Sequence, residues 1–437
     1  MKSDDKLNEN HWEYFSELKS EFLSNVKSTN QKNIIIPNSV TSINENAFFD
    51  CRDIETVTIP DSVTNIGNGA FKDCSSLETI NIPNSVKKIG RSAFRRCVNL
   101  KSITIPDSIK TFEPFVLEDC KSLKTIKIPE TVTKIEKFAF AGCCNLEDIQ
   151  IPVSVTYIGG SAFKDCKKIE EIVIPNSVIS IGGKGYISGN SFWRCTNLKT
   201  IVIPNSVTEL GSGTFKGCSS LENITLPDSI TSIKENVFEG CCKLKTITIP
   251  NSVTKIGREA FKDCSSLEEI IIPDSVTSIE ESAFKGCRSL KRISIPDSVI
   301  NLAEDRKNIY KNLTFSLYNL VKEQKIPYSA INIGSGIFCE CSSLEEIIIS
   351  NSITSIDEGM FEGCSNLKSI TIPDSVTNIE WGAFKDCISL KSIIIPDTVT
   401  NIGECAFYGC KKLKKVSIPQ SCIINDSFEK YTDVTRY

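Results

Sequence analysis

Histidine is almost absent from this 437-residue chain, which contains only His11. A Ser-His or Cys-His nucleophile pair needs a histidine beside the nucleophile. Because His11 lies outside the repeated region described below, that region cannot build such a pair. C-x-x-C spacings and Gly-rich phosphate loops are missing as well, and these features are typical of zinc and nucleotide sites. The sequence therefore predicts a protein that is not an enzyme and that holds no cofactor and no metal.

Long apolar runs and a strong net charge are also missing. No stretch approaches the roughly 18 apolar residues of a membrane helix, and residues 1–15 are polar where a secretory signal has its apolar core. The net charge of −4 gives no general attraction to phosphate backbones. We expect no membrane insertion and no nucleic-acid partner, and the sequence alone favours a cytoplasmic location.

Cysteine, in contrast, is abundant, with 20 residues. Disulfide frameworks are typical of short secreted chains, whereas fifteen of these cysteines recur at one position of a 23-residue repeat. An odd number cannot pair completely, and a buried thiol behaves as a small apolar group. We expect a buried, unreactive structural ladder, with disulfides or metal binding as the alternative. The ladder comprises Cys51, Cys74, Cys97, Cys120, Cys143, Cys166, Cys195, Cys218, Cys241, Cys264, Cys287, Cys341, Cys364, Cys387 and Cys410.

The repeat occupies most of the chain and reads P-x-S-V-T-x-I-G-x-x-A-F-x-x-C-x-x-L-x-x-I-x-I, as in residues 60–82. Its last six residues alternate in hydrophobicity and predict a short strand, which the next proline ends. Gly67 suits a tight turn. Since one repeat cannot bury its apolar side alone, neighbouring repeats must stack. We expect an α/β-type solenoid of about 15–16 coils with a parallel sheet on one face.

These repeats resemble the BspA-like leucine-rich repeats, and the resemblance covers roughly residues 34–423. It implies a leucine-rich-repeat solenoid. It also implies a surface or secreted protein of the kind that bacteria and parasitic protists use for adhesion to host proteins and to other cells. The resemblance therefore favours the cell surface, where the sequence alone favours the cytoplasm, and the compartment stays open.

The chain divides into three predicted segments. Residues 1–33 form an extension with a helix over about 11–27, which we expect to cover the first coil, with partner binding as the alternative. Residues 34–423 form the solenoid, with insertions near 182–190 and 301–331. The second insertion predicts an amphipathic helix over 304–323. Residues 424–437 form a tail that closes the last coil incompletely, so an open strand edge favours a homo-oligomer.

The informative positions are those that the repeat leaves free. The residue between the two strand isoleucines is aliphatic in five repeats, all in the second two thirds of the chain. Exposed aliphatic side chains on a strand mark a contact site; the alternative is simple β-propensity. The candidate partner-binding residues are Val173, Val202, Ile271, Ile348 and Ile394 of this column, together with Arg292, Trp193, Trp381 and Tyr310.

Taken together, these features predict a non-enzymatic, adhesion-type scaffold that binds a protein partner through its sheet face and its insertions. The alternative is an intracellular assembly scaffold or a self-associating structural protein.

Overall fold

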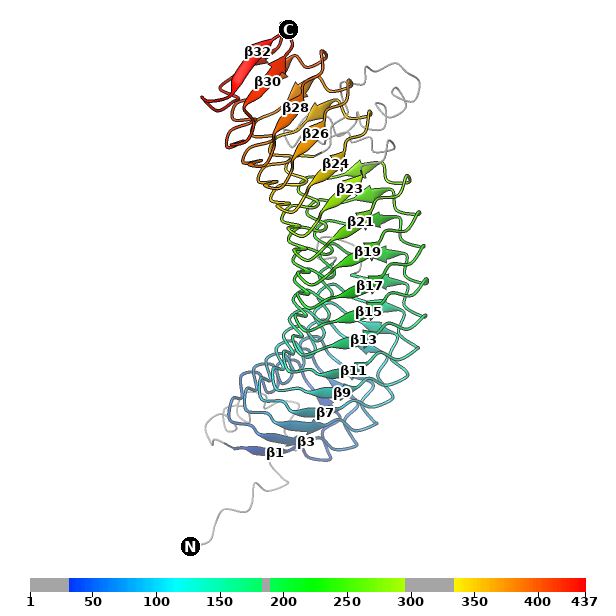
Figure 1. Ribbon diagram of the computed structural model, residues 1–437. Coiled ribbons are helices and arrows are strands. Elements are labelled where there is room, and N and C mark those ends of the chain that lie inside the picture. Colours follow the sequence, from blue (N-terminus) through cyan, green and yellow to red (C-terminus); the bar gives the residue numbers. More distant parts are fainter. Residues whose placement is uncertain (1–30, 183–188, 295–333) are drawn as a thin grey trace, which may run out of the picture. The chain divides into compact units, whose positions relative to one another are not determined.

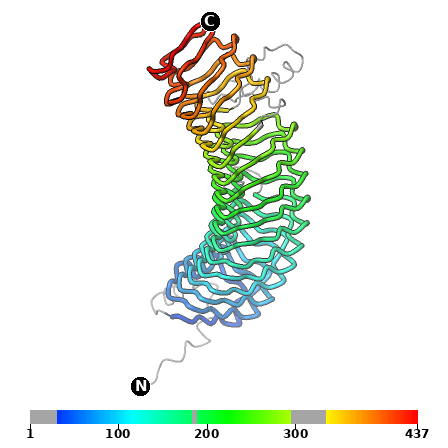
Figure 2. The backbone as a smooth tube through the Cα atoms, viewed as in Figure 1, coloured from blue at the N-terminus to red at the C-terminus, as the bar shows by residue number. Residues whose placement is uncertain are grey.

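The structure is a computed structural model that describes residues 31–182, 189–294 and 334–437 (Figure 1). The chain divides into two compact units, Met1–Val207 and Thr208–Tyr437, which we call unit 1 and unit 2. Figure 2 shows the backbone of each unit as a stack of similar coils. The coils are built from short strands and turns, so the repeat solenoid is confirmed.

The α/β designation is wrong for the part of the chain that the structure describes, because that part contains no helix. The predicted helices over 11–27 and 304–323, including the helical cap, lie outside the described residues. The described coils contain no helix because each uses its residues for two strands and a turn segment. The turn segment holds two residues in the left-handed region. A helix does not tolerate such residues.

The L-x-x-I-x-I segments form the predicted parallel strands, which we call series A. The central residue of each strand is buried and its neighbours face outward, as in Thr56–Thr58. The strands pair in register, with Val57 opposite Ile80. In unit 1 series A comprises β1 (Asn33–Ile35), β3 (Thr56–Thr58), β5 (Thr79–Asn81), β7 (Ser102–Thr104), β9 (Thr125–Lys127), β11 (Asp148–Gln150), β13 (Glu171–Val173) and β15 (Thr200–Val202). In unit 2 it comprises β17 (Asn223–Thr225), β19 (Thr246–Thr248), β21 (Glu269–Ile271), β23 (Arg292–Ser294), β24 (Glu346–Ile348), β26 (Ser369–Thr371), β28 (Ser392–Ile394), β30 (Lys415–Ile418) and β32 (Asp433–Arg436).

A second set of parallel strands, which we call series B, comes from the V-T-x-I segments. Sequence analysis expected a sheet on one face only, because a strand of two residues is too short to show a period. In unit 1 series B comprises β2 (Ser42–Ile43), β4 (Asn65–Ile66), β6 (Lys88–Ile89), β8 (Thr111–Phe112), β10 (Lys134–Ile135), β12 (Tyr157–Ile158) and β14 (Ser180–Ile181). In unit 2 it comprises β16 (Glu209–Leu210), β18 (Ser232–Ile233), β20 (Lys255–Ile256), β22 (Ser278–Ile279), β25 (Ser355–Ile356), β27 (Asn378–Ile379), β29 (Asn401–Ile402) and β31 (Ile423–Ile424).

The third side of each coil, which we call the turn side, replaces a strand by alternating hydrogen bonds. The amides of Phe71 and Asp73 donate to the next coil at 2.8 Å, whereas the amide of Cys74 donates back to Phe71 within its own coil at 3.3 Å. Asp73 has φ 62°, and the residue before each ladder cysteine shares this left-handed conformation. Gly, Asp and Asn accept it most readily, which explains why Asp and Gly recur there.

Side-chain donors tie the coils together at fixed places. Ser62 Oγ donates to the carbonyl of Val40 at 2.7 Å, and Thr64 Oγ1 donates to the carbonyl of Thr41 at 3.2 Å. The same bonds recur from coil to coil at equivalent positions. A buried carbonyl that lacks a partner costs free energy, so the P-x-S-V-T part of the repeat is kept for its hydroxyl donors as well as for its turn.

Gly67 begins a turn, as expected, but a second feature requires glycine there. A Cβ atom at this position would lie 2.5 Å from the backbone nitrogen of Glu45 in the preceding coil. The close approach of two main chains therefore accounts for glycine, because real Cβ atoms do not sit that close to backbone atoms.

A file of phenylalanine rings fills the interior of each unit. Neighbouring rings stack, with centroids 5.0 Å apart for Phe48 and Phe71 and 5.4 Å apart for Phe261 and Phe284. In unit 2 the file continues from Phe284 to the ring after the long insertion at 6.0 Å. The insertion therefore leaves the core unbroken.

Leu117 interrupts this file, and its own coil compensates. Phe112 replaces the isoleucine of the V-T-x-I segment, and its buried ring lies 5.2 Å from that of Phe140. This coil therefore carries its phenylalanine at the V-T-x-I position and an aliphatic residue, Leu117, at the position of the ring file. The interior volume of the coil stays nearly constant.

Residues 424–437 fold onto the last coil. Strand β32 pairs in parallel with β30, and Phe428 extends the ring file at 4.9 Å from Phe407. The Tyr437 hydroxyl donates to the carbonyl of Ile395 at 2.7 Å. The outermost strand, β32, carries Asp433 and Arg436, and charged residues on an edge strand oppose pairing with further strands.

The exchange of Phe112 and Leu117 predicts a strong coupling between the two positions. Leu117→Phe alone overfills the interior and Phe112→Ile alone leaves a gap, so each should lower the free energy of unfolding by about 1–3 kcal/mol. The double variant restores the common repeat and should come within about 1 kcal/mol of the parent chain. Urea unfolding of the four proteins measures this, and simple addition of the two losses would contradict it.

Candidate protein-interaction surface

In unit 2 the third residues of the series A strands from β19 to β28 form a column in which hydroxyl residues and isoleucine alternate. Ile271, Ile348 and Ile394 expose 82%, 70% and 78% of their surface. Their register partners on one neighbouring strand are polar: Thr248 lies opposite Ile271, and Thr371 lies opposite Ile394. We call these three isoleucines the isoleucine column. Each stands on a strand whose central residue is buried, so the column is held rigidly.

Unit 1 carries a smaller set of exposed aliphatic residues on series A. Val173 and Val202 lie opposite each other on paired strands and expose 78% and 65% of their surface. Ile35 occupies the same column opposite Thr58 and is 71% exposed. The expectation that this column is aliphatic only in the second two thirds of the chain is therefore wrong. The residue was missed because it precedes Pro37, where the first complete repeat begins.

Charged residues flank the isoleucine column. The Arg292 guanidinium lies 3.7 Å from the Glu346 carboxylate, and the Lys368 ammonium lies 3.2 Å from the Glu345 carboxylate. All four side chains are largely exposed, so each pair contributes at most about 1 kcal/mol to stability. These ion pairs lie on the surface and contribute little to the stability of the fold. Arg292 is a charged neighbour of the isoleucine column.

The two candidate tryptophans lie away from this column, on the turn side of their coils. Trp193 packs under Lys164, whose Nζ lies 4.1 Å from the ring centroid. Trp381 is 41% exposed and lies 5.4 Å from Lys385 Nζ. The structure therefore does not bring them together with the isoleucines. Tyr310 lies outside the described residues.

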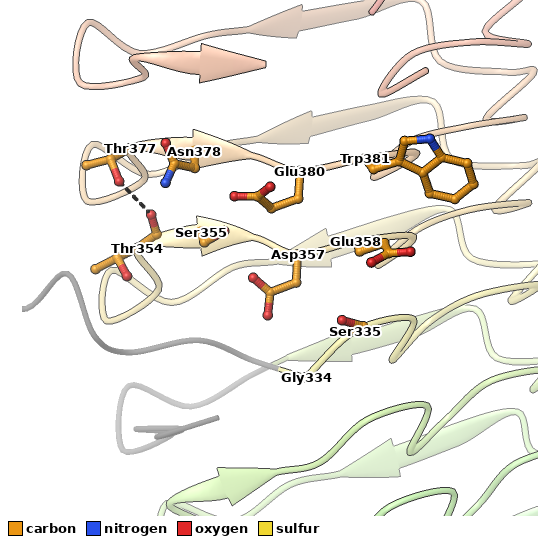
Figure 3. Close-up of a pocket in the computed structure, with 10 residues that line it drawn as sticks. All are labelled: Gly334, Ser335, Thr354, Ser355, Asp357, Glu358, Thr377, Asn378, Glu380 and Trp381. Atoms are coloured by element: carbon orange, nitrogen blue, oxygen red, sulfur yellow. Dashed lines mark hydrogen bonds between the residues drawn. The ribbon is translucent and has the colours of Figure 1, made fainter. Parts of the chain in front are cut away.

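A polar cavity of about 350 Å³ lies in unit 2 beside Trp381 (Figure 3). Asp357 and Glu380 line it, and a hydrogen bond of 3.2 Å joins Thr377 Oγ1 to the carbonyl of Thr354 at its edge. Burial, with the Glu380 charge adding to it, raises the pKa of Asp357 to about 7 against the opposing hydrogen bond from Ser355. Sequence analysis missed this site, since Asp357 stands where many repeats have glycine. Across the described ranges, no group of His, Cys, Asp and Glu is arranged to hold a metal ion.

The fifteen ladder cysteines lie in the interior, and none of the twenty cysteines forms a disulfide in this structure. Cys264 Sγ donates to the carbonyl of Phe238 at 3.1 Å, and Cys387 Sγ donates to that of Phe361 at 3.2 Å. Burial raises the pKa of these thiols, to about 12 for Cys410. The thiolate is the reactive form. The ladder thiols stay protonated at neutral pH and are therefore unreactive.

Sequence comparison settles the family. The model of the BspA type leucine-rich repeat region matches residues 22–143, 87–186, 185–314 and 307–435. The chain belongs to this family. The resemblance seen in the repeats is thus confirmed.

Solved structures of leucine-rich repeat proteins resemble this chain to different degrees. A leucine-rich repeat protein from Bacteroides ovatus is 29% identical, with 93% of this chain and 92% of that chain covered and a TM-score of 0.64. A leucine rich cell surface protein from Faecalibacterium prausnitzii is 27% identical, with coverage of 89% and 87% and a TM-score of 0.39. No curated protein matches the chain. Among the described residues, no helix is long and apolar enough to cross a membrane.

The burial pattern of this BspA-type chain predicts selective thiol labelling. Cys242 is exposed and Cys144 and Cys405 are half-buried, so a membrane-impermeant maleimide should label these three in the native protein. The ladder cysteines should react only after denaturation. Mass spectrometry of the labelled peptides identifies the sites, and rapid native labelling of Cys264 or Cys387 would contradict the buried arrangement.

The raised thiol pKa values also predict loss of stability in alkali. In the unfolded chain the Cys410 thiol ionises near its ordinary value of 9, whereas in the folded chain it ionises near 12. Its contribution is intact below pH 9 and is lost as the pH rises from 9 towards 12. Replacing Cys410 by Ala should reduce the fall of unfolding free energy across this range by about 1.4 kcal/mol per pH unit. Urea unfolding under reducing conditions measures the slope, and an unchanged slope would refute it.

Proposed function

We propose that this chain is a protein-binding scaffold and that the isoleucine column of unit 2 is its principal contact surface. The observation that carries the proposal is the exposure of three large aliphatic side chains at equivalent outward positions of series A. An exposed aliphatic residue that becomes buried when a partner binds stabilises the complex more than its share of the contact area suggests, provided that the surrounding polar rim excludes water.

The scaffold around the column supports this function. Within unit 2 the series A strands β23 and β24 pair in register, and the phenylalanine rings of neighbouring coils stack in the interior. A rigid surface loses little conformational entropy when a partner binds. The outward side chains do not pack in the core, so they can vary without loss of the fold and can serve in recognition.

Adhesion at a cell surface is the setting that we propose. Its support is membership of the BspA-type leucine-rich repeat family. Val173, Val202 and Ile35 on unit 1 would add a second, smaller contact region. The insertions near 182–190 and 301–331 are proposed as further contacts, and Trp193 and Trp381 as recognition residues of the turn side.

An intracellular assembly scaffold is the second candidate. The observation that favours it is that the twenty cysteines form no disulfide and that Cys242 is exposed, since oxidising compartments favour disulfides. Antibody staining of intact and permeabilised cells separates the two settings. Staining of intact cells would exclude a purely cytosolic role, and staining only after permeabilisation would exclude a surface role.

The contact surface predicts the effect of a triple substitution. Ile271→Asp, Ile348→Asp and Ile394→Asp together should abolish recovery of the native partner on immobilised protein, with each change alone weakening binding by about tenfold. The three positions are exposed, so the fold should be retained and far-UV circular dichroism should be unchanged.

A matched control places the same charges elsewhere. Asn251→Asp, Asn351→Asp and Asn366→Asp alter exposed turn residues of the same unit outside series A and should leave binding intact. Undiminished recovery of every partner by the isoleucine variant would exclude the column as the contact surface.

A further inference from the structure

The polar cavity of unit 2 carries negative charge that no neighbouring side chain neutralises. Three of its ten lining residues are acidic and none is basic (Figure 3). Asp357 is only 8% exposed, and the half-buried Glu380 comes from the following coil. Among the described residues neither carboxylate forms an ion pair, and Ser355 is the one side chain whose hydrogen bond favours the charged form of Asp357. A buried charge without a counter-charge costs free energy, so the cavity favours a cation as its ligand.

Other coils of unit 2 show which cation these positions accept. Glu280 directly follows a series B isoleucine, as both cavity carboxylates do. Lys255, the first residue of the series B strand in the preceding coil, places its ammonium 2.5 Å from the Glu280 carboxylate. Lys234 and Glu209 form the same ion pair with the two charges exchanged. In the cavity Ser355 stands in place of the lysine, so the carboxylates of this ion pair are present without an ammonium group.

We propose that this cavity binds the ammonium group of a lysine side chain from a partner protein. The site lies beside series B, and the inference does not depend on the isoleucine column. The ammonium would lie between Asp357 and Glu380, as the Lys255 ammonium lies against its carboxylate in another coil. The cavity volume of about 350 Å³ is at the low end for ligand sites, which fits one side chain better than a large molecule.

The lining also offers acceptors for the remaining protons of an ammonium group. A lysine ammonium has three donors and no acceptor. Besides the carboxylates, the Ser355 hydroxyl and the Asn378 amide oxygen line the cavity and can accept a hydrogen bond. Glu358 and Trp381 of the lining are exposed, so the cavity reaches the surface and a side chain can enter it.

Binding of an ammonium is linked to the ionisation of Asp357, whose pKa burial raises to about 7. Its charged neighbours in the lining are Glu380 of the following coil and Glu358 of its own coil, whereas the preceding coil presents Gly334 and Ser335, which do not titrate. Neutral Asp357 attracts a cation less, so affinity should rise about tenfold per pH unit from pH 5 towards 7 and level off above about pH 8. Lysine itself stays charged up to about pH 10.

The direct test is isothermal titration calorimetry of the full chain with Nα-acetyl-lysine-N-methylamide at about pH 8, where Asp357 is ionised. We expect it to bind at least about tenfold more tightly than the same compound acetylated at Nε, which has no charge. Equal binding of the two compounds, or no binding of the charged one at millimolar concentration, would overturn the inference. Tighter binding of 1,5-diaminopentane would assign the cavity to a free amine and overturn the partner lysine.

Three variants locate the bound ammonium. Asp357→Asn keeps the shape of the side chain and should weaken binding by at least about tenfold and remove its pH dependence. Ser355→Lys supplies an ammonium from within the chain, as Lys255 does, and should abolish binding. Glu404→Gln removes an exposed carboxylate of the same unit outside the cavity and should change nothing. An unchanged affinity of Asp357→Asn would exclude the site.

A lysine of this same chain is the competing occupant, and proton release distinguishes it. If the cavity is free, about half of the Asp357 side chains are protonated at pH 7, so binding should release about half a proton. If a lysine of the chain already fills the cavity, Asp357 is ionised and no proton is released. Calorimetry in two buffers with different ionisation enthalpies measures the release, and a value of zero would overturn the inference.

Discussion

The hydrogen bonding of each coil to its neighbours is the constraint on which the rest of the structure depends. The amide of Gly67 donates to Ile43 in the preceding coil at 2.7 Å, and the amide of Phe71 donates to Ala93 in the following coil at 2.8 Å. Since main-chain groups of a 23-residue coil cannot be satisfied within it, coils are stable only as a stack. Any residue added within series A would shift the register and turn a buried isoleucine outward.

The same constraint explains where the chain accepts insertions. In unit 1 the amide of Gly182 still bonds to Ile158 at 2.9 Å, and the amide of Ser161 bonds to the carbonyl of Gly189 at 2.8 Å. The coil therefore resumes on its turn side directly after residues 183–188. In unit 2, Arg292 and Glu346 remain register partners on either side of the long insertion. Both insertions lie outside series A, so the strands that carry the exposed aliphatic residues keep their register.

Sequence patterns predicted what recurs in every repeat and missed what depends on contact between repeats. The alternation around Ile80 predicted series A, and the spacing of Cys74 and Cys97 predicted that the thiols occupy equivalent interior positions. Series B escaped notice, since a strand of two residues has no period. The role of Gly67 was only half recognised, because its neighbour Glu45 belongs to another coil and is invisible in a linear pattern.

The candidate site was predictable only in part for the same reason. Isoleucine at an outward strand position stands out against the polar consensus, which is how Ile271 and Ile394 were found. The exposure of Ile35 was missed because its repeat is incomplete at the start. Trp193 and Trp381 were grouped with the column by residue type, and the structure separates them because three sides of a coil face three directions. Asp357 gave no signal, since its burial follows from packing rather than from sequence.

Stacking also limits the kind of partner that such a face can recognise. Contact residues can stand only at multiples of one strand spacing along the axis, because every coil contributes one outward position to each column. A partner with its own repeat along this axis can match several contacts at once, whereas a partner of another period matches one and then falls out of step. The affinity therefore grows with the number of coils only for a ligand whose repeat matches the strand spacing. Specificity in this fold comes from spacing as much as from the identity of the side chains.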